Sequence, residues 1–188
     1  MNIFLLNECP VISAQEQCDK HVVKMIVESA QMLSTAHRLI DGEATKVLSK
    51  NGRRMTTYKL KDMYMDGILY KSVHTGHPST LWTTESLDNY VWHYNHFVAL
   101  CDEYEYRYGK VHATRLLLEK PLRNTPKNIP DIGPTPFKLA MGSNPECMVA
   151  DPVEAYQLYY QTKQDRFKMV WSKRDVPSWF KVQEVEAA

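Results

Sequence analysis

One stretch near the N-terminus places four polar side chains of different chemistry along a single line. Residues 19–32 include no Gly or Pro, and their apolar residues recur at helical spacing, which predicts a helix. Its narrow polar stripe, spaced at i, i+3, i+7 and i+10, consists of His21, Lys24, Glu28 and Gln31. Charges on a surface helix usually spread over its outer face, so this single file indicates the rim of a pocket. The alternative is a solvated stripe with an (i, i+4) ion pair worth a few tenths of a kcal/mol.

The length, composition and net charge of the chain limit the classes of protein to which it can belong. The chain of 188 residues, 44% hydrophobic and 24% charged, predicts one domain over residues 1–188 with a real core. The formal net charge of +1 argues against a strongly basic chain that coats nucleic acid, although a local basic patch still permits DNA binding. No apolar run approaches the length of a membrane span. We expect a cytoplasmic monomer that does not bind a membrane.

The cysteines are scattered and predict neither a disulfide framework nor a metal site. Four cysteines without a C-x-x-C motif fit reduced thiols in a cytosol. Cys18 and His21 have a spacing that resembles half of a zinc site, but no second pair completes it. We therefore expect no metal and no other cofactor.

The pattern predicts a mainly α fold, a compact bundle of about three long helices with long connecting loops. Met1–Leu6 is expected to be buried, and no stretch alternates strongly enough to indicate a sheet. Ser13 with Glu16 predicts a helix N-terminus, while Asp41-Gly42 and Gly109 predict helix ends. The expected segments are helices over 14–40, 84–108, 110–120 and 151–167, and a loop over 121–145 with one helical turn at 137–141.

Two further segments carry basic or imidazole groups. Residues 43–69 contain a basic cluster with interleaved tyrosines, which is typical of a solvated loop or short helix; the alternative is a phosphate-binding surface. His77 lies between Gly76 and Pro78 in a turn before a helix that Ser79 or Thr80 would cap. His77 is either a local hydrogen-bonding residue or a phosphate contact.

Three segments, taken in order, resemble the pyrimidine-dimer DNA glycosylase family of the phage endonuclease V type. The first is Asp19-Lys-His21 followed seven residues after the histidine by the acid Glu28. The second is Gly76-His77 before a long helix that ends in a basic-aromatic-Gly turn at Gly109. The third is the run RDVPSWFK at 174–181, which is similar to the family's C-terminal Arg-Pro-Thr-Trp-Tyr-Lys run. The chain resembles a divergent branch with additional sequence over 41–70 and 119–151.

The resemblance implies a base-excision chemistry. Family members attack the sugar C1′ of a damaged nucleotide with an N-terminal α-amine and form a Schiff base, and β-elimination then cuts the strand. An α-amine suits this role because its ordinary pKa of about 7.7–8.0 leaves a neutral fraction at pH 7. Glu28 corresponds to the family's catalytic glutamate. The DNA contacts implied by the resemblance are His21, Gln31, Arg38, His77, Arg174, Trp179 and Lys181.

The chain departs from the family at the nucleophile and at the phosphate-binding arginines. The family's amine belongs to a small residue at position two, whereas position two here is Asn2, so the amine belongs to Asn2 or, if the initiator stays, to Met1. Two helix positions that are arginine in the phage enzyme are Val27 and Gln31 here, which removes bidentate phosphate contacts. Lys24, one turn before the glutamate, is either a replacement amine or only a phosphate contact or ion-pair partner.

Three functions follow as hypotheses. The first, which we favour, is an enzyme of a bacterial or phage-infected cell: a DNA N-glycosylase with possible abasic-site lyase activity on a damaged or modified duplex, with the base flipped out. The second keeps the fold and the pocket but processes or hypermodifies a nucleobase or nucleotide. The third is a non-catalytic module that binds nucleic acid or a protein.

Overall fold

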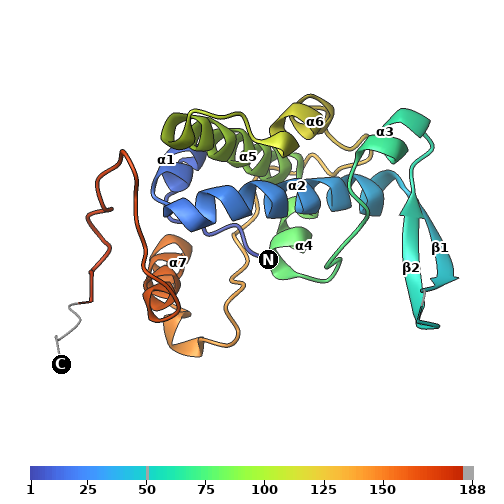
Figure 1. The fold of residues 1–188 in the computed structure, drawn as a ribbon. Helices are drawn as coiled ribbons and strands as arrows, with labels where there is room; N and C mark the ends of the chain where they lie inside the picture. The colour runs from blue at the N-terminus through green and yellow to red at the C-terminus, as the bar shows by residue number, and fades with distance from the viewer. Residues whose placement is uncertain (50, 184–188) are drawn as a thin grey trace.

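The computed structural model describes residues 1–49 and 51–183 and is built mainly from helices (Figure 1). Within these residues the elements are, in order, α1 (Pro10–Gln15), α2 (Asp19–Asp41), β1 (Glu43–Leu48), β2 (Arg54–Lys59), α3 (Met63–Ile68), α4 (Pro78–Glu85), α5 (Leu87–Tyr108), α6 (Ala113–Leu122), the 3-10 helix η1 (Pro145–Cys147), α7 (Pro152–Gln161) and the 3-10 helix η2 (Thr162–Asp165). The expected mainly α class is confirmed. The number of long helices is not, because only α2 and α5 exceed ten residues in the described part.

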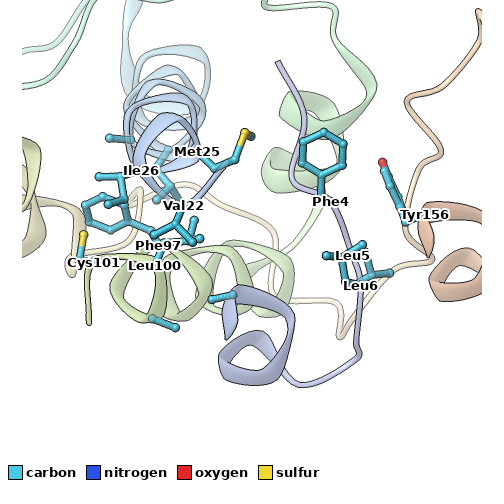
Figure 2. Packing of buried hydrophobic residues seen from close by; sticks show 14 of the residues in the cluster. Phe4, Leu5, Leu6, Val22, Met25, Ile26, Phe97, Leu100, Cys101 and Tyr156 are labelled. Atoms are coloured by element: carbon cyan, nitrogen blue, oxygen red, sulfur yellow. The ribbon is translucent and has the colours of Figure 1, made fainter. Parts of the chain in front are cut away.

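The two long helices pack against each other at the centre of the core (Figure 2). Val22 and Ile26 of α2 face Phe97 and Leu100 of α5, and all four side chains are fully buried. Burial of one such side chain stabilises the fold by about 1.5–3 kcal/mol. The apolar face of α2 therefore packs against α5. The polar stripe of α2 does not take part in this packing.

The N-terminal segment runs through the core, as its composition predicted. Residues 2–6 are all buried, and Phe4, Leu5 and Leu6 lie between the long helices and Tyr156 of α7 (Figure 2). Phe4 has a left-handed backbone (φ 56°), which is uncommon for an aromatic residue. Its ring stacks on His21 of α2 with the ring centroids 4.8 Å apart. The start of the chain is therefore fixed against the polar stripe of α2.

The start of the first long helix was predicted wrongly. The helix α2 begins at Asp19, after the separate short helix α1, and not near position 14. Ser13 does not cap a helix: its hydroxyl donates to the carbonyl of Phe4 and accepts from the amide of Leu6, each at 3.1 Å. The expected capping box failed because the buried N-terminal segment uses the same hydroxyl. The predicted end at Asp41 is confirmed.

Residues 43–59 form an antiparallel hairpin, which contradicts the expectation of no sheet. β1 pairs with β2 from Glu43 opposite Lys59 to Leu48 opposite Arg54, and Gly52 (φ 71°) lies in the turn. All six residues of β1 are exposed. Because neither face of the hairpin enters the core, the alternation of apolar and polar residues that marks a half-buried strand is absent.

The predicted helix over 84–108 is divided into α4 and α5 at Ser86. Ser86 has an extended backbone, and its hydroxyl accepts a hydrogen bond from the amide of Asn89 at 3.2 Å. Gly109 ends α5 in the left-handed conformation (φ 63°), as expected. His77 itself caps α4, because its Nδ1 accepts from the amide of Ser79 at 3.2 Å.

The C-terminal third departs from expectation in detail. Pro121 lies inside α6, which continues to Leu122, so the proline does not end that helix. The helical turn expected at 137–141 is absent, and the only regular element of the described loop is η1. Asp151 caps α7 as predicted, accepting from the amide of Glu154 at 2.8 Å. α7 and η2 together stop at Asp165, short of the expected position 167.

Buried histidines make the stability of this fold depend on pH. Mainly because of burial, the pKa is lowered to about 3 for His21 and His96, to about 4 for His37, and well below its ordinary value for His93. An unfolded histidine titrates near pH 6.5, so the unfolded state binds more protons below that pH. We expect the free energy of unfolding to be constant above about pH 6.5 and to fall below it, by up to about 1.4 kcal/mol per pH unit for each histidine. Urea unfolding at pH 7.5 and pH 5.0 measures this; equal free energies would contradict it.

Among the described residues, no helix combines the length and the apolar character needed to cross a membrane.

Candidate active site

The α-amine of the chain meets the carboxylate of Glu28. The Met1 nitrogen lies 3.6 Å from Glu28 Oε2, and the backbone amide of Asn2 donates to the same oxygen at 3.1 Å. The Met1 side chain is 4% exposed and packs into a small apolar cluster with Trp82. The Asn2 side chain is also held, because its Nδ2 donates to the carbonyl of Ala140 at 3.1 Å. In this structure the α-amine of Met1 therefore lies beside the Glu28 carboxylate.

Lys24 approaches the same carboxylate from the other side. Its Nζ lies 3.0 Å from Glu28 Oε1, which confirms the (i, i+4) ion pair predicted from spacing. The Lys24 side chain is 59% exposed, whereas that of Glu28 is only 14% exposed. The carboxylate is thus placed between two amines, the buried one at the chain start and the solvent-exposed one of Lys24. An exposed pair of this kind contributes little to stability.

These groups lie in a cavity of about 510 Å³. Its volume falls within the roughly 300–1,000 Å³ of small-molecule sites. Among the described residues, four cationic side chains, the α-amine of Met1 and a single carboxylate line it, together with aromatic rings. The lining that the helix stripe did not reveal comprises Phe4, Lys20, Tyr159, Lys163, Arg166 and Phe167. The excess of positive charge and the ring surfaces favour an anionic ligand with a flat aromatic part.

His21 forms part of the cavity wall as a neutral group. It is 6% exposed, and its Nδ1 lies 2.7 Å from the hydroxyl of Tyr160. Burial, together with the nearby cations Lys24 and Lys163, lowers its pKa to about 3. At pH 7 the ring is therefore uncharged and acts through hydrogen bonding and stacking, not as a cation for phosphate.

Lys163 is the most buried cation of the cavity, and the sequence analysis did not find it. The residue is 8% exposed and lies in η2, with its Nζ 3.3 Å from the centre of the Tyr159 ring. A buried lysine is unusual without a nearby compensating group. The capping signature at Asp151 predicted a helix over 151–167, which includes Lys163. No local pattern in the sequence distinguishes Lys163 from a surface lysine.

Two of the other predicted contacts lie close to the cavity. His77 lies beside the chain start: burial lowers its pKa, and the charge of the Met1 amine lowers it further. Gln31 is half-buried on the same helix stripe, one turn beyond Glu28. Neither residue belongs to the cavity lining itself.

The remaining predicted contacts are occupied elsewhere in the structure. Arg38 is fully buried at the other end of α2 and donates to the carboxylate of Asp66 at 2.6 Å and to backbone carbonyls. This hydrogen bond holds the pKa of Asp66 below its ordinary value. Arg174 forms a bidentate pair with Glu103. Trp179 is half-buried with its ring against Tyr160, 6.1 Å between centroids. Lys181 is exposed.

A second, slightly larger cavity of about 540 Å³ lies near the end of α2. Two carboxylates line it: Asp41 accepts from the amides of Lys127 and Asn128, and Asp62 accepts from the amide of Tyr64 at the start of α3. His37 at its wall is buried against the hydroxyl of Tyr90, and burial lowers its pKa to about 4. We place the candidate active site in the first cavity because only there do an α-amine and a carboxylate meet.

The described residues contain no cluster of three or more histidine, cysteine or acidic side chains arranged to hold a metal ion. The four cysteines are free thiols, three of them buried.

Comparison with known proteins identifies no relative. No family model matches the chain, and neither a curated protein nor a solved structure is significantly similar to it. The likeness to the pyrimidine-dimer glycosylases is carried by the three motif segments of the sequence alone.

Proposed function

We propose that this protein is a DNA base-excision enzyme, an N-glycosylase with abasic-site lyase activity that uses its α-amine as the nucleophile. The observation that carries the proposal is the chain-terminal amine 3.6 Å from the Glu28 carboxylate within a cationic cavity. An amine attacks a sugar carbon only in its neutral form, and a carboxylate within this distance is suited to take up the proton.

The chemistry balances with the groups present. The amine nitrogen attacks C1′ as the glycosidic bond breaks, and the base leaves with the bonding electrons and takes up a proton. Opening of the sugar gives an imine between the nitrogen and C1′. Loss of a proton from C2′ then expels the 3′-phosphate, and water hydrolyses the imine to restore the amine. Glu28 stabilises the cationic sugar and carries the protons.

The rest of the cavity supplies binding. Lys20, Lys163 and Arg166 place positive charge where the phosphates of a nucleotide would lie. Tyr159 and Phe167 offer ring faces on which a flipped base stacks. His21, being neutral, stacks or hydrogen bonds without adding to the charge.

Borohydride trapping tests the nucleophile. With an abasic-site duplex and borohydride we expect a stable protein–DNA adduct, because reduction converts the imine to a secondary amine. Intact mass of the free protein shows whether Met1 is present, and peptide mapping of the adduct should place it on the first residue of the chain.

The lysines serve as matched controls for that assignment. Lys24→Met and Lys163→Met each remove a side-chain amine of the cavity and leave the α-amine, so the adduct should persist in both. An adduct that maps to either lysine would overturn the α-amine assignment, and the absence of any adduct would overturn the lyase proposal.

A second candidate function has one observation in its favour. Four cationic side chains and the Met1 amine surround a single carboxylate in the described lining, which is equally suited to the phosphate of a free nucleotide. An enzyme that processes a modified nucleotide would act on nucleosides or nucleotides in the absence of DNA. Turnover of a free nucleotide, together with a failure to trap abasic DNA, would favour this function over the first.

A further inference from the structure

The hairpin β1–β2 stands out from the helical body with both of its faces exposed. In Figure 1 it projects on the same side of α2 as the N-terminus. All residues of β1 are exposed, and in β2 only Thr57 and Tyr58 are half-buried. A two-stranded hairpin is at best marginally stable by itself in water, so its position must be maintained from its base.

The base of the hairpin is anchored to α2 by buried contacts. Arg38 donates to the carbonyl of Tyr58 at 2.9 Å and to Asp66 at 2.6 Å. Gly42 joins α2 to β1 where a Cβ would lie 2.3 Å from the carbonyl oxygen of Arg38, so only glycine fits this junction. The hairpin is thus held at a defined orientation relative to the helix that carries Glu28.

Positive charge is concentrated in this projection. Residues 43–61 contain six of the chain's 23 lysines and arginines but only one of its 22 acids. That acid, Glu43, pairs with Lys61 at the hairpin base, 3.5 Å apart. The rest of the chain carries more acids than cations, so the net charge of +1 conceals a strongly basic arm.

Apolar side chains accompany the charge at the outer end. Val47 lies opposite Met55, and Leu48 lies opposite Arg54. Leu48 is 69% exposed and Met55 is 46% exposed. Exposed apolar residues next to arginine and lysine are the composition of groove-binding elements, in which cations contact phosphates and an apolar side chain presses between base steps.

We propose that the hairpin is a DNA-binding arm that binds the duplex beside the damaged nucleotide. This inference deepens the proposed function and rests on it for the identity of the ligand. Lys46, Arg53 and Arg54 contact the phosphate backbone, and the apolar end enters a groove. From Glu28 to Asp41 the helix rises by about 20 Å, which corresponds to about six base steps of 3.4 Å. The arm therefore contacts DNA on one side of the damaged nucleotide only.

A charge-removal variant tests the arm by binding to undamaged DNA. The variant K46Q/R53Q/R54Q alters only exposed side chains. We expect its affinity for a 20-base-pair duplex to fall at least about tenfold at 0.1 M salt, and the salt slope to decrease by up to about 2.7 for three phosphate contacts. The control K110Q/K120Q/R123Q removes the same charge near α6, on the other side of α2, and should retain the affinity.

These experiments distinguish a failure of the DNA-binding arm from a failure of the proposed amine chemistry. If both triple variants bind the duplex with equal affinity and equal salt slope, and unfold at the same temperature as the wild type, the proposal of a DNA-binding arm is overturned. The proposal is also overturned if the variant K46Q/R53Q/R54Q loses binding to anionic lipid vesicles while its DNA binding is unchanged. Borohydride trapping on a short single-stranded abasic oligonucleotide reports on the amine chemistry alone, and the arm variant should retain it. Shortening the duplex to three base pairs on one side of the abasic site should weaken binding for one side only.

Discussion

Replacing Glu28 by glutamine should lower the rate of strand cleavage at an abasic site by about 10²–10⁴-fold, the usual contribution of a positioned acid–base group. The amide keeps the size of the carboxylate, and its oxygen still accepts the Asn2 amide hydrogen bond. It has no negative charge to stabilise a cationic sugar and does not take up the proton of the amine. Single-turnover cleavage of a labelled abasic duplex, at saturating protein, measures this loss.

The control for that variant is a glutamate outside the cavity. Glu105→Gln changes a half-exposed carboxylate on α5 that lies 3.6 Å from Arg115, and we expect cleavage at the wild-type rate. Lys24→Met removes the exposed partner of Glu28 and should reduce the rate far less than Glu28→Gln. Wild-type cleavage by Glu28→Gln would show that this carboxylate is only a surface ion-pair partner.

Replacing Arg38 by methionine should lower the free energy of unfolding by about 3–5 kcal/mol, the cost of removing one partner of a buried ion pair. The guanidinium is fully buried. Besides the bond to Asp66, it donates hydrogen bonds to the backbone carbonyls of Tyr58, Leu69 and Tyr70. Each of these oxygens loses a donor in the variant. Urea unfolding at pH 7.5 measures the difference.

Two variants place that result in context. Arg38→Lys keeps the charge but not the planar set of donors, so we expect an intermediate loss. Lys61→Met breaks the ion pair of a lysine that is 82% exposed, and should cost less than about 1 kcal/mol. If Arg38→Met were as stable as the wild type and lost only DNA affinity, Arg38 would be a DNA contact, as the resemblance implied, and not an anchor of the hairpin.

Local sequence patterns predicted those features whose causes are local. The spacing of the stripe in α2 predicted the pairing of Lys24 with Glu28, because residues four apart share a helix face. Gly109 and Asp151 predicted a helix end and a helix start, because the left-handed glycine and the capping carboxylate satisfy backbone groups of their own helix. The apolar start of the chain predicted its burial.

The errors arose where a distant segment uses the same group. Ser13 has the signature of a helix cap, but its hydroxyl bonds to the N-terminal segment. The resemblance implied a DNA contact for Arg38; in the structure its donors meet Asp66 and backbone carbonyls, and the DNA contact stays a prediction. The hairpin was missed because a strand with two solvated faces has no alternating pattern.

The sequence by itself determined the helix that carries Glu28, the side chains that share its polar stripe, and the apolar face that packs on α5. These follow from the period of the α-helix and from the hydrophobic effect. Only the tertiary structure decided that the chain start runs through the core to bring its amine to Glu28, and that Lys163 closes the same cavity from more than 130 residues away. No local pattern encodes such a meeting, because it depends on how distant segments pack together.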